Sequence, residues 1–464
     1  MMMTRLALPE SDLASFVARF TGTVIGPDDA GYPAARAVWN GMIDRYPALI
    51  VRPRTTGEVA AAVLLAADHD LPVAVRGGGH NVAGLGVCDT GVVIDLADMA
   101  TVQVDADTST IRAGGGCTWG RLDAAAAEHG LATPGGLISS TGVAGLTLGG
   151  GIGWLARKYG YSCDNLIAVE LVTADGSTVV AAEDQHPDLF WAVRGGGGNF
   201  GVVTSLTFRG HPVSTVLGGL LLYRGDRAGE VLAEYRRWAA ELPEAMTTLA
   251  ALNTAPPAPF VPADLQLTPA VAVALCHVGD PSEGNALLDR FRAACPPDAD
   301  AVDPMPYPVL QSMLDASAPH GQRNYWKSGY LDALQPDLQR TVIAAAARMV
   351  SPFDQIHLNQ LGGAITTNTG GAVGHRDDAY VINVIGACTD PADDAANIAW
   401  VQDSWAAIEP FTTGGYLNFL AGDDGADRVR SAYPPETWTR LEHIKRDWDP
   451  HNVFHINHNI RPVG

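Results

Sequence analysis

The chain has 464 residues and a formal net charge of −21; 47% of its residues are hydrophobic and 17% are charged. This length exceeds the usual size of a single hydrophobic core, so we expect two domains of a packed globular protein. The acidic balance argues against a nucleic-acid partner, because phosphate binding needs a basic surface. Solubility is the simplest explanation of the excess negative charge.

The cysteines and the N-terminus limit where the protein works. Six cysteines are scattered without a Cys-x-x-Cys pair, which predicts neither a disulfide framework nor a zinc site. Residues 1–16 include acidic side chains and lack a long apolar core, so they do not resemble a secretory signal. No later apolar run is long enough to span a bilayer. We therefore expect a cytoplasmic protein with no membrane contact.

Helices and short strands alternate through the first 210 residues. Thr55-Thr56-Gly57-Glu58 has capping-box spacing and predicts a helix to about Asp68. Hairpins are predicted where two strand-like runs flank a turn, as at Asp175-Gly176. The other predicted elements are helices over 10–20, 119–129 and 187–193 and strands over 48–51, 71–75, 92–96, 102–104, 110–112, 166–173, 178–181 and 202–208.

Composition changes after about residue 211, where glycine becomes rarer and longer helical patterns appear. We interpret residues 211 to about 415 as a second α+β domain. Its predicted helices are 228–242, 282–294 and 336–349, and its predicted strands are 220–223, 270–276, 357–362 and 380–385.

Residues 75–81, Val-Arg-Gly-Gly-Gly-His-Asn, are the most informative segment. The three consecutive glycines, Gly77 to Gly79, allow the backbone to bend through positive φ and to bring its N–H groups close to a ligand. Convergent N–H groups of this kind form an anion site suited to a diphosphate. His80 follows at once, so its imidazole is expected to lie against whatever the glycines bind.

Two further glycine clusters follow. Residues 134–153 hold so many glycines that core filling cannot explain them, since each costs about 0.5–1 kcal/mol in a regular element. Close approach to a flat or phosphorylated ligand explains them better, with structural turns as the alternative. Residues 196–201 match Gly-x-Gly-x-x-Gly, but a helix precedes and a strand follows them, the reverse of a Rossmann site. They form either a tight turn or a backbone that lines a cofactor.

Four motifs together resemble a known family. They are 76–80, 142–153, 188–195 with 199–201, and 449–454. Over nearly its whole length the chain resembles the berberine-bridge-enzyme-like FAD-linked oxidases of the vanillyl-alcohol oxidase and p-cresol methylhydroxylase superfamily. The resemblance implies a two-domain α+β FAD-binding fold of the p-cresol methylhydroxylase type: an FAD-binding domain (1–210), an inserted α+β substrate domain (211–415) and a C-terminal segment (416–464) that completes the FAD domain.

The resemblance implies FAD attached covalently through His80 only, because Ile138 stands where many relatives carry a cysteine for a second link. Taken alone, His80 would more often be a surface or hydrogen-bonding residue. Thr141 aligns with the oxygen gate, where oxygen-reactive relatives often have valine; its added hydroxyl leaves oxygen reactivity open. The other residues expected to contact the cofactor are Arg76, Gly77, Gly78, Gly79, Asn81, Gly142, Gly145, Gly150, Gly153, Val203, Tyr416 and Asn418.

The same resemblance suggests the catalytic and substrate residues. Residues 416–419, Tyr-Leu-Asn-Phe, are expected to form a strand that turns the Tyr416 phenol toward the flavin. A phenol is a weak base, so a nearby cation or donor must stabilise its phenolate; Lys327 and Arg323 are the candidates. The second catalytic candidate is Tyr380. The expected substrate contacts are Tyr325, Gln360 and Asn383, with packing as the alternative for each.

We expect an FAD-dependent oxidase that removes a hydride from a C–H bond next to a hydroxyl or amine of a small organic substrate and reduces oxygen to hydrogen peroxide. The alternatives are a flavin dehydrogenase with another acceptor, a non-redox cyclase or isomerase that retains FAD, and a flavin-bearing binding protein. His455 and His458 lie in the segment that resembles the family's tail, so we expect no metal there. Neither the substrate nor the oligomeric state follows from the sequence.

Overall fold

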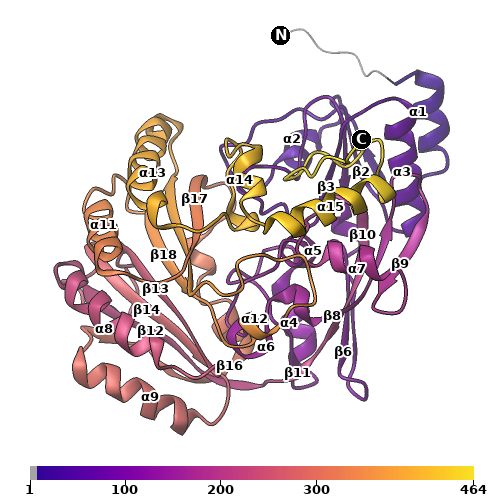
Figure 1. Ribbon diagram of the computed structural model, residues 1–464. Coiled ribbons are helices and arrows are strands. Elements are labelled where there is room, and N and C mark those ends of the chain that lie inside the picture. Colours follow the sequence, from indigo (N-terminus) through magenta and orange to yellow (C-terminus); the bar gives the residue numbers. More distant parts are fainter. Residues whose placement is uncertain (1–7) are drawn as a thin grey trace.

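The computed structural model describes residues 8–464, which form three main β-sheets (Figure 1). The first sheet has the order β1-β2-β4-β3, in which β2, β4 and β3 are parallel. The second sheet is antiparallel, with the order β5-β6-β10-β8-β9. Their strands are β1 (Thr23–Ile25), β2 (Leu49–Arg52), β3 (Val73–Arg76), β4 (Val92–Asp95), β5 (Val102–Asp105), β6 (Thr110–Gly114), β8 (Leu166–Val172), β9 (Thr178–Ala182) and β10 (Val202–Arg209).

The third sheet has eight antiparallel strands, in the order β15-β12-β14-β13-β18-β19-β17 with β16 paired to β12. All of them come from the middle of the chain. They are β12 (Thr215–Arg224), β13 (Met246–Thr254), β14 (Pro269–His277), β15 (Ala299–Asp300), β16 (Asp303–Pro306), β17 (Arg323–Leu331), β18 (Gln355–Gln360) and β19 (Tyr380–Cys388). The predicted strands in this region are confirmed, whereas β13 and β17 were not predicted.

Helices pack against these sheets, and a short ladder joins β7 (Leu131–Ala132) to β11 (His211–Pro212). The helices are α1 (Glu10–Val17), α2 (Tyr32–Arg36), α3 (Thr56–Asp68), α4 (Trp119–Ala127), α5 (Val143–Leu148), α6 (Ala156–Tyr159), α7 (Pro187–Val193), α8 (Ala228–Ala240), α9 (Pro281–Ala294), α10 (Tyr307–Gln311), α11 (Pro336–Ala346), α12 (Ala364–Thr367), α13 (Asp394–Ile408), α14 (Ala426–Arg430) and α15 (Pro435–Trp448). Within the described residues, no helix is both long and apolar enough to cross a membrane.

Local sequence explains the elements that carry the first glycine loop. The predicted cap of α3 is present, because Thr55 Oγ1 accepts a hydrogen bond of 3.2 Å from Glu58 N. Val92, Val93 and Ile94 of β4 are all fully buried, since a central parallel strand is covered on both faces. Parallel strands β4 and β3 thus lie beneath the segment that continues from Arg76 into the glycines.

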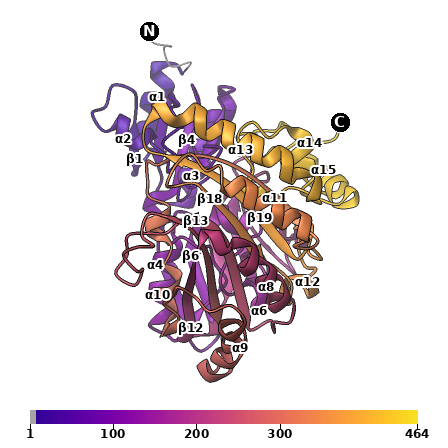
Figure 2. The same ribbon diagram turned by 90° about the vertical axis from the view of Figure 1, so that its left-hand side faces the viewer.

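One face of the third sheet is covered by helices. Apolar residues of β12, β13, β14, β18 and β19 share a core with α8, α9, α11 and α13, and Figure 2 shows these helices in front of the sheet. Side chains alternate between the faces of a strand, so every second residue of β17, β18 and β19 points away from these helices. That second face is turned toward the glycine loops.

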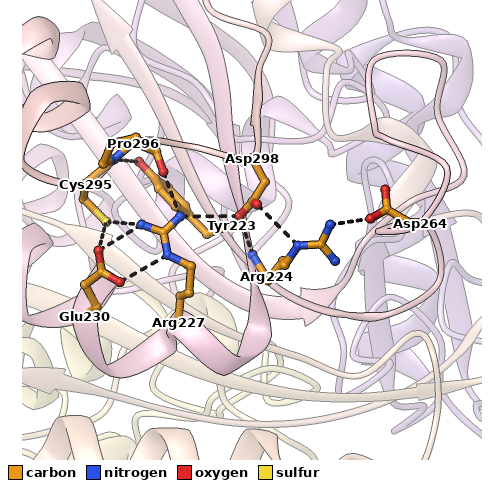
Figure 3. A network of polar contacts seen from close by, with 8 residues as sticks. All are labelled: Tyr223, Arg224, Arg227, Glu230, Asp264, Cys295, Pro296 and Asp298. Atoms are coloured by element: carbon orange, nitrogen blue, oxygen red, sulfur yellow. Dashed lines mark hydrogen bonds and ion pairs between the residues drawn. The ribbon is translucent and has the colours of Figure 1, made fainter.

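A polar network closes the outer edge of this helix-covered layer (Figure 3). Arg227, just before α8, pairs with Glu230 at 2.9 Å and with Asp298 at 3.5 Å, and it donates to Pro296 O at 2.7 Å. Arg224 at the end of β12 pairs with Asp264 and Asp298. None of the residues drawn lines the main cavity, so the network ties strand and helix ends together away from the site.

The C-terminal segment returns to the first half of the chain. Leu417, Leu441 and Ile460 belong to the same hydrophobic core as residues of β6, β8 and β10, and α15 packs against α7. In Figure 1 the yellow helices α14 and α15 accordingly lie beside the elements of the first half. Helix α15 was not predicted from the sequence.

Candidate active site

A large cavity lies between the glycine loops and the uncovered face of the third sheet. It encloses about 2010 Å³ of space between atoms, its open mouth included, against about 210 Å³ for the next cavity. Of these two cavities in residues 8–464, the first has room for a dinucleotide and the second does not. Of the residues predicted as site residues, it is lined by Arg76, Gly77, Gly78, Gly79, His80, Asn81, Thr141, Gly142, Gly145, Val203, Asn383, Tyr416 and Asn418.

Bare main chain forms one wall of this cavity. Gly78 and Gly142 touch through their backbones, because a Cβ on either would lie 2.3 Å from the other's nitrogen. At Gly145 and Gly198 a Cβ would meet no atom within 4 Å, and both glycines line the cavity. A side chain at either position would project into the space. These segments therefore form a cradle whose N–H groups can reach a flat or phosphorylated ligand.

Arg76 and Asn81 hold the first glycine loop in place. The Arg76 guanidinium is buried and donates to Asp95 Oδ2 at 2.9 Å and to Ala35 O at 2.5 Å. Asn81 Oδ1 accepts from Leu85 N at 3.2 Å, within the same turn. The Arg76 guanidinium and the Asn81 carbonyl oxygen are thus bonded within the protein, which fixes the shape of the loop.

His80 is half-buried at the end of the loop and has defined neighbours. Its imidazole stacks on Trp39, with ring centroids 4.7 Å apart and planes inclined by 19°. Its Nε2 lies 2.8 Å from Ser140 Oγ. Burial lowers the pKa of His80 to about 4, with His320 contributing in the same direction. At neutral pH the imidazole is therefore uncharged and keeps a free lone pair, as a nucleophile requires.

Tyr416 is placed differently from its prediction. Residues 417–419 form a 3₁₀ turn, so the predicted strand over 416–419 is wrong, although Tyr416 itself is extended. The phenol oxygen accepts hydrogen bonds from Gly151 N at 3.1 Å, Ile152 N at 3.2 Å and Asn418 Nδ2 at 3.1 Å. No described residue accepts a hydrogen bond from the phenol. Burial raises the pKa of Tyr416 to about 12, while these three donors act to lower it.

Neither predicted cation lies near Tyr416. Lys327 Nζ pairs with Asp423 at 2.9 Å and with Asp424 at 2.6 Å. Arg323 forms two hydrogen bonds to Asp394. Both predictions are wrong because each cation is neutralised by its own acidic partner. The groups that stabilise charge on the phenol oxygen are instead backbone N–H groups and one amide, which no sequence pattern marks.

The predicted strands at β18 and β19 are correct as segments, but most of the side chains assigned to the cavity on β17, β18 and β19 lie on the helix side. Tyr325 packs against the helix-side core and donates to Asp423, and Gln360 bonds to Thr248 and Ala239 O. Tyr380 lies in the same helix-side core, so its catalytic assignment is wrong as well. A strand alternates sides at each residue, so a slip of one position reverses the face.

The cavity face of these strands carries a different set of side chains. Only Asn383 among the predicted substrate and second catalytic residues lines the cavity. The alternation itself was the signal that could have found the others. The residues on this face that sequence reasoning missed are Asn324, Gln355, His357, Asn359 and Ile385.

Two predicted glycines also lie outside the cavity lining. A Cβ on Gly153 would lie 1.7 Å from Gly135 O, so this glycine permits backbone packing. Gly150 has φ of +114° and lies behind the Tyr416 ring, where a Cβ would be 3.7 Å from Cε2. Both positions require glycine for structural reasons, and their assignment as cofactor contacts stays a prediction.

The comparisons agree with this architecture. Residues 47–182 match a family model for an FAD binding domain, and residues 415–461 match the model "Berberine and berberine like". The (R)-6-hydroxynicotine oxidase of Paenarthrobacter nicotinovorans is 31% identical, and the alignment covers 100% of both chains. The chain belongs to the berberine-bridge-enzyme-like FAD-linked oxidoreductases.

Solved structures of this family superpose over nearly the whole chain. The 6-hydroxy-D-nicotine oxidase of Arthrobacter nicotinovorans has a TM-score of 0.86 and 29% identity, and the match covers 96% of this chain and 98% of that one. The glucooligosaccharide oxidase of Acremonium strictum has a TM-score of 0.86 at 21% identity, and it carries a 6-S-cysteinyl, 8α-N1-histidyl FAD. The predicted family and the predicted fold type are confirmed.

The residues of this berberine-bridge-enzyme-like chain fit FAD. The cradle at Gly145 and Gly198 is space that a side chain would fill. Asn457 Oδ1 and His458 Nε2 are buried atoms in residues that line the cavity, and neither has a partner among the described residues. Such atoms require a ligand or water. The tail thus contributes to the site beyond the predicted Tyr416 and Asn418.

His458 and His455 do not face a common point as metal ligands would. Burial lowers the pKa of His458 to about 4, and His455 Nδ1 bonds to Asn452 O at 2.9 Å. Within residues 8–464, no group of three His, Cys, Asp or Glu side chains is arranged to hold a metal ion.

Proposed function

We propose that this FAD-linked oxidoreductase is an oxidase that converts an alcohol or amine to the corresponding carbonyl or imine and releases hydrogen peroxide. FAD, when bound, supplies the two-electron acceptor for this chemistry. The residues of the chain bind and orient it, exclude water and move the substrate proton. The nicotine and oligosaccharide oxidases among its relatives support a small-molecule substrate.

The proposed base is Tyr416, and its hydrogen bonding is the observation that supports this role. Three N–H donors converge on its oxygen, and residues 8–464 offer no acceptor for its hydrogen. A neutral phenol has two lone pairs to offer and one hydrogen to donate, so the three donors favour the phenolate as it forms, against the burial that raises the pKa of Tyr416 to about 12 and keeps the resting phenol neutral. The phenolate takes the proton from the substrate's O–H or N–H group while the neighbouring C–H bond loses its hydride.

The proposed anchor of FAD is His80. Its imidazole is neutral, it stacks on Trp39, and its Nε2 is occupied by Ser140, which leaves Nδ1 for a covalent bond. Ile138 lines the cavity between the two glycine segments, so no thiol is available there for a second link. We therefore propose attachment through His80 only.

Oxygen is the proposed second substrate. The electrons removed from the alcohol pass on to O₂, which takes two electrons and two protons and leaves as H₂O₂. Thr141 lines the cavity, and its β-branched side chain has the shape of valine with a hydroxyl in place of one methyl. A dehydrogenase would share the first half of the reaction and fail to release peroxide in air.

The test compares Tyr416→Phe with Tyr380→Phe, a phenol on the helix side of the third sheet. The rate of anaerobic flavin bleaching by a substrate found in a peroxide screen is expected to fall by at least about 100-fold in Tyr416→Phe, the usual weight of a general base. Tyr380→Phe is expected to retain the wild-type rate. Equal bleaching rates in the two variants would contradict the role of Tyr416, and reduced flavin that stays reduced in air would contradict the oxidase assignment.

A further inference from the structure

Three neighbouring strands place polar side chains side by side on the cavity face of the third sheet. Asn383 in β19 lies directly opposite His357 of β18 and Ser328 of β17. Residues opposite each other in antiparallel strands share a face, with Cβ atoms about 4.5–5.5 Å apart. His357, Asn383 and Ser328 therefore form one continuous set of side chains, which we call the polar row; His357 and Asn383 line the cavity, and Ser328 lies on the same face behind the lining.

Two members of the polar row are buried and unpartnered. Asn383 is 2% exposed and Ser328 is 1% exposed. Neither Asn383 Oδ1 nor Ser328 Oγ has a hydrogen-bond partner among the described residues. Leaving such an atom without a partner costs about 1–3 kcal/mol, so native proteins nearly always supply one. Asn383 lines the cavity, and the partner can therefore come from a ligand bound there.

His357 completes the polar row as an uncharged acceptor. Its Nε2 lies 2.9 Å from Gln355 Oε1, and an amide oxygen can only accept, so Nε2 carries the hydrogen. Nδ1 is then left with a free lone pair. Burial lowers the pKa of His357 to about 4, so the ring is neutral at physiological pH.

No free charge faces this part of the cavity. Within the described residues, the lining contains no Asp, Glu or Lys, and its single arginine, Arg76, is bonded to Asp95 and Ala35 O. A carboxylate or ammonium group on a substrate would lose its water here without gaining an ionic partner. That exchange is unfavourable, whereas an uncharged polar group needs only hydrogen bonds.

Aromatic surface lies next to the polar row. Trp326 and Phe419 both line the cavity, with ring centroids 5.7 Å apart and planes nearly perpendicular. Trp326 stands on β17 two residues before Ser328, on the same face of the strand. A ring of the substrate can therefore contact indole while its polar substituent reaches the row.

Resting on the proposed function, we propose that the polar row binds a hydroxyl or carbonyl group of an uncharged, ring-bearing substrate, and that the site rejects the carboxylate and ammonium forms of the same skeleton. This assigns the substrate class to neutral alcohols in preference to protonated amines and acids. The polar row selects the substrate, and Tyr416 removes the substrate proton.

The first test uses three flat compounds of nearly equal shape that cannot be oxidised by hydride removal: 4-hydroxybenzamide, 4-hydroxybenzoate and 4-hydroxybenzamidine. Binding to the oxidised holoenzyme at neutral pH is followed by the change in the visible spectrum of bound FAD. The neutral amide is expected to bind at least about tenfold tighter than either ion. Each ion would bury a charge without an ionic partner, which costs binding free energy. Equal or tighter binding of an ion, or no binding of any of the three, would overturn the proposal.

The second test changes the charge of the row. Asn383→Asp is expected to improve binding of the amidine relative to the amide by at least about tenfold, because it introduces a partner for a cation. Asn285→Asp in α9, which adds the same charge outside the cavity, is expected to leave the preference unchanged. Wild-type selectivity in Asn383→Asp would overturn the assignment. His357→Asp carries the same expectation and replaces Asn383→Asp if that variant does not fold.

These measurements separate the two proposals. The compounds report on binding without turnover, so their order of affinity does not depend on Tyr416 as a base or on oxygen as the acceptor. A preference for an ion together with substrate-dependent peroxide release would refute the substrate class and leave the oxidase standing. If the predicted preference is found but no substrate releases peroxide, the substrate class stands and the oxidase function is refuted.

Discussion

At the scale of single residues, the phenol of Tyr416 is in the most unusual environment. Its side chain is 1% exposed and has two backbone donors and one amide donor on its oxygen. Burial opposes ionisation and the donors favour it, so the balance of the two sets the working pH range. Asn418 is the donor that a substitution can remove, because the other two belong to the main chain.

Removal of the Asn418 donor is expected to slow the reaction at every pH. The pKa of Tyr416 is raised to about 12, so the phenolate fraction, and with it kcat/KM, should rise up to tenfold per pH unit from pH 7 to pH 10. In Asn418→Ala the pKa rises further, and kcat/KM at a given pH should fall by about 10- to 100-fold, the worth of a hydrogen bond to an anion. The rate of flavin reduction without oxygen, measured as a function of pH in both proteins, tests this fall in kcat/KM. Tyr330→Phe, which removes a neighbouring phenol, is the control, and a rate plateau at neutral pH in wild type would contradict the scheme.

His80 carries the prediction about cofactor attachment. Purified wild-type protein should keep its yellow colour in the pellet after acid precipitation, and His80→Ala should lose it to the supernatant. Ser140→Ala should slow covalent incorporation of added FAD by about 3- to 10-fold, because one hydrogen bond orients the ring. Ser139→Ala, whose hydroxyl bonds to Asp315, is the matched control. Incorporation should be constant from pH 6 to pH 8, since the imidazole is neutral well above pH 4.

At the scale of elements, the N-terminus of α3 shows how a sequence motif acquires a second role. Thr55 caps the helix as its spacing predicts. The Glu58 carboxylate reaches back to the N–H groups of Thr21, Gly22 and Arg54, which join α3 to the segment before β1. These hydrogen bonds lower the pKa of Glu58 to about 2 although burial alone would raise it.

The carboxylate of Glu58 should make stability depend on pH. Its folded-state pKa is below the ordinary value of 4.5, so the native state holds fewer protons, and the contribution is present above pH 4.5 and lost as pH falls toward 2. Glu58→Gln should lower the unfolding temperature at pH 7. It should also make the unfolding temperature depend less on pH between pH 4.5 and 3. Glu283→Gln, in the exposed first turn of α9, should change neither. Parallel pH profiles for wild type and Glu58→Gln would contradict this.

Strand register explains which site predictions failed. The sequence marks β18 and β19 as strands, and the apolar residues alternate in β18, whereas β19 is apolar on both faces. Tyr380 and Gln360 were assigned to the cavity and lie on the other face, because alternation tells which residues share a face and not which face the helices cover. That choice depends on where α8 and α11 pack, which is a property of the assembled domain.

At the scale of the whole molecule, a buried ion pair holds the returning C-terminal segment. Lys445 and Asp449 are both fully buried and 2.6 Å apart. Lys445 also donates to Asn199 O at 2.7 Å and to Phe454 O at 2.9 Å. It therefore connects α15, the third glycine segment and the tail that carries Asn457 and His458 into the cavity.

Loss of this pair should weaken both the fold and the cofactor site. Lys445→Met should lower the free energy of unfolding by about 3–5 kcal/mol, because it leaves a buried carboxylate without its partner, and it should lower FAD retention. Arg446→Met removes the next cation, which pairs with Asp447 at the surface, and should cost less than about 1 kcal/mol. Urea unfolding monitored by circular dichroism measures both. Similar losses in the two variants would refute the structural role of Lys445.

The sequence by itself determined many of the helices and strands, the glycine segments and the family, because local spacing and motifs are properties of neighbouring residues. Thr55, Gly77 to Gly79 and His80 were recognised in this way. The tertiary structure alone decided what surrounds Tyr416, which cations are already paired and which face of β17, β18 and β19 meets the cavity. Those outcomes depend on contacts between residues far apart in the sequence, from 71 positions for Arg323 with Asp394 to 265 for Gly151 with Tyr416, and no local pattern records them.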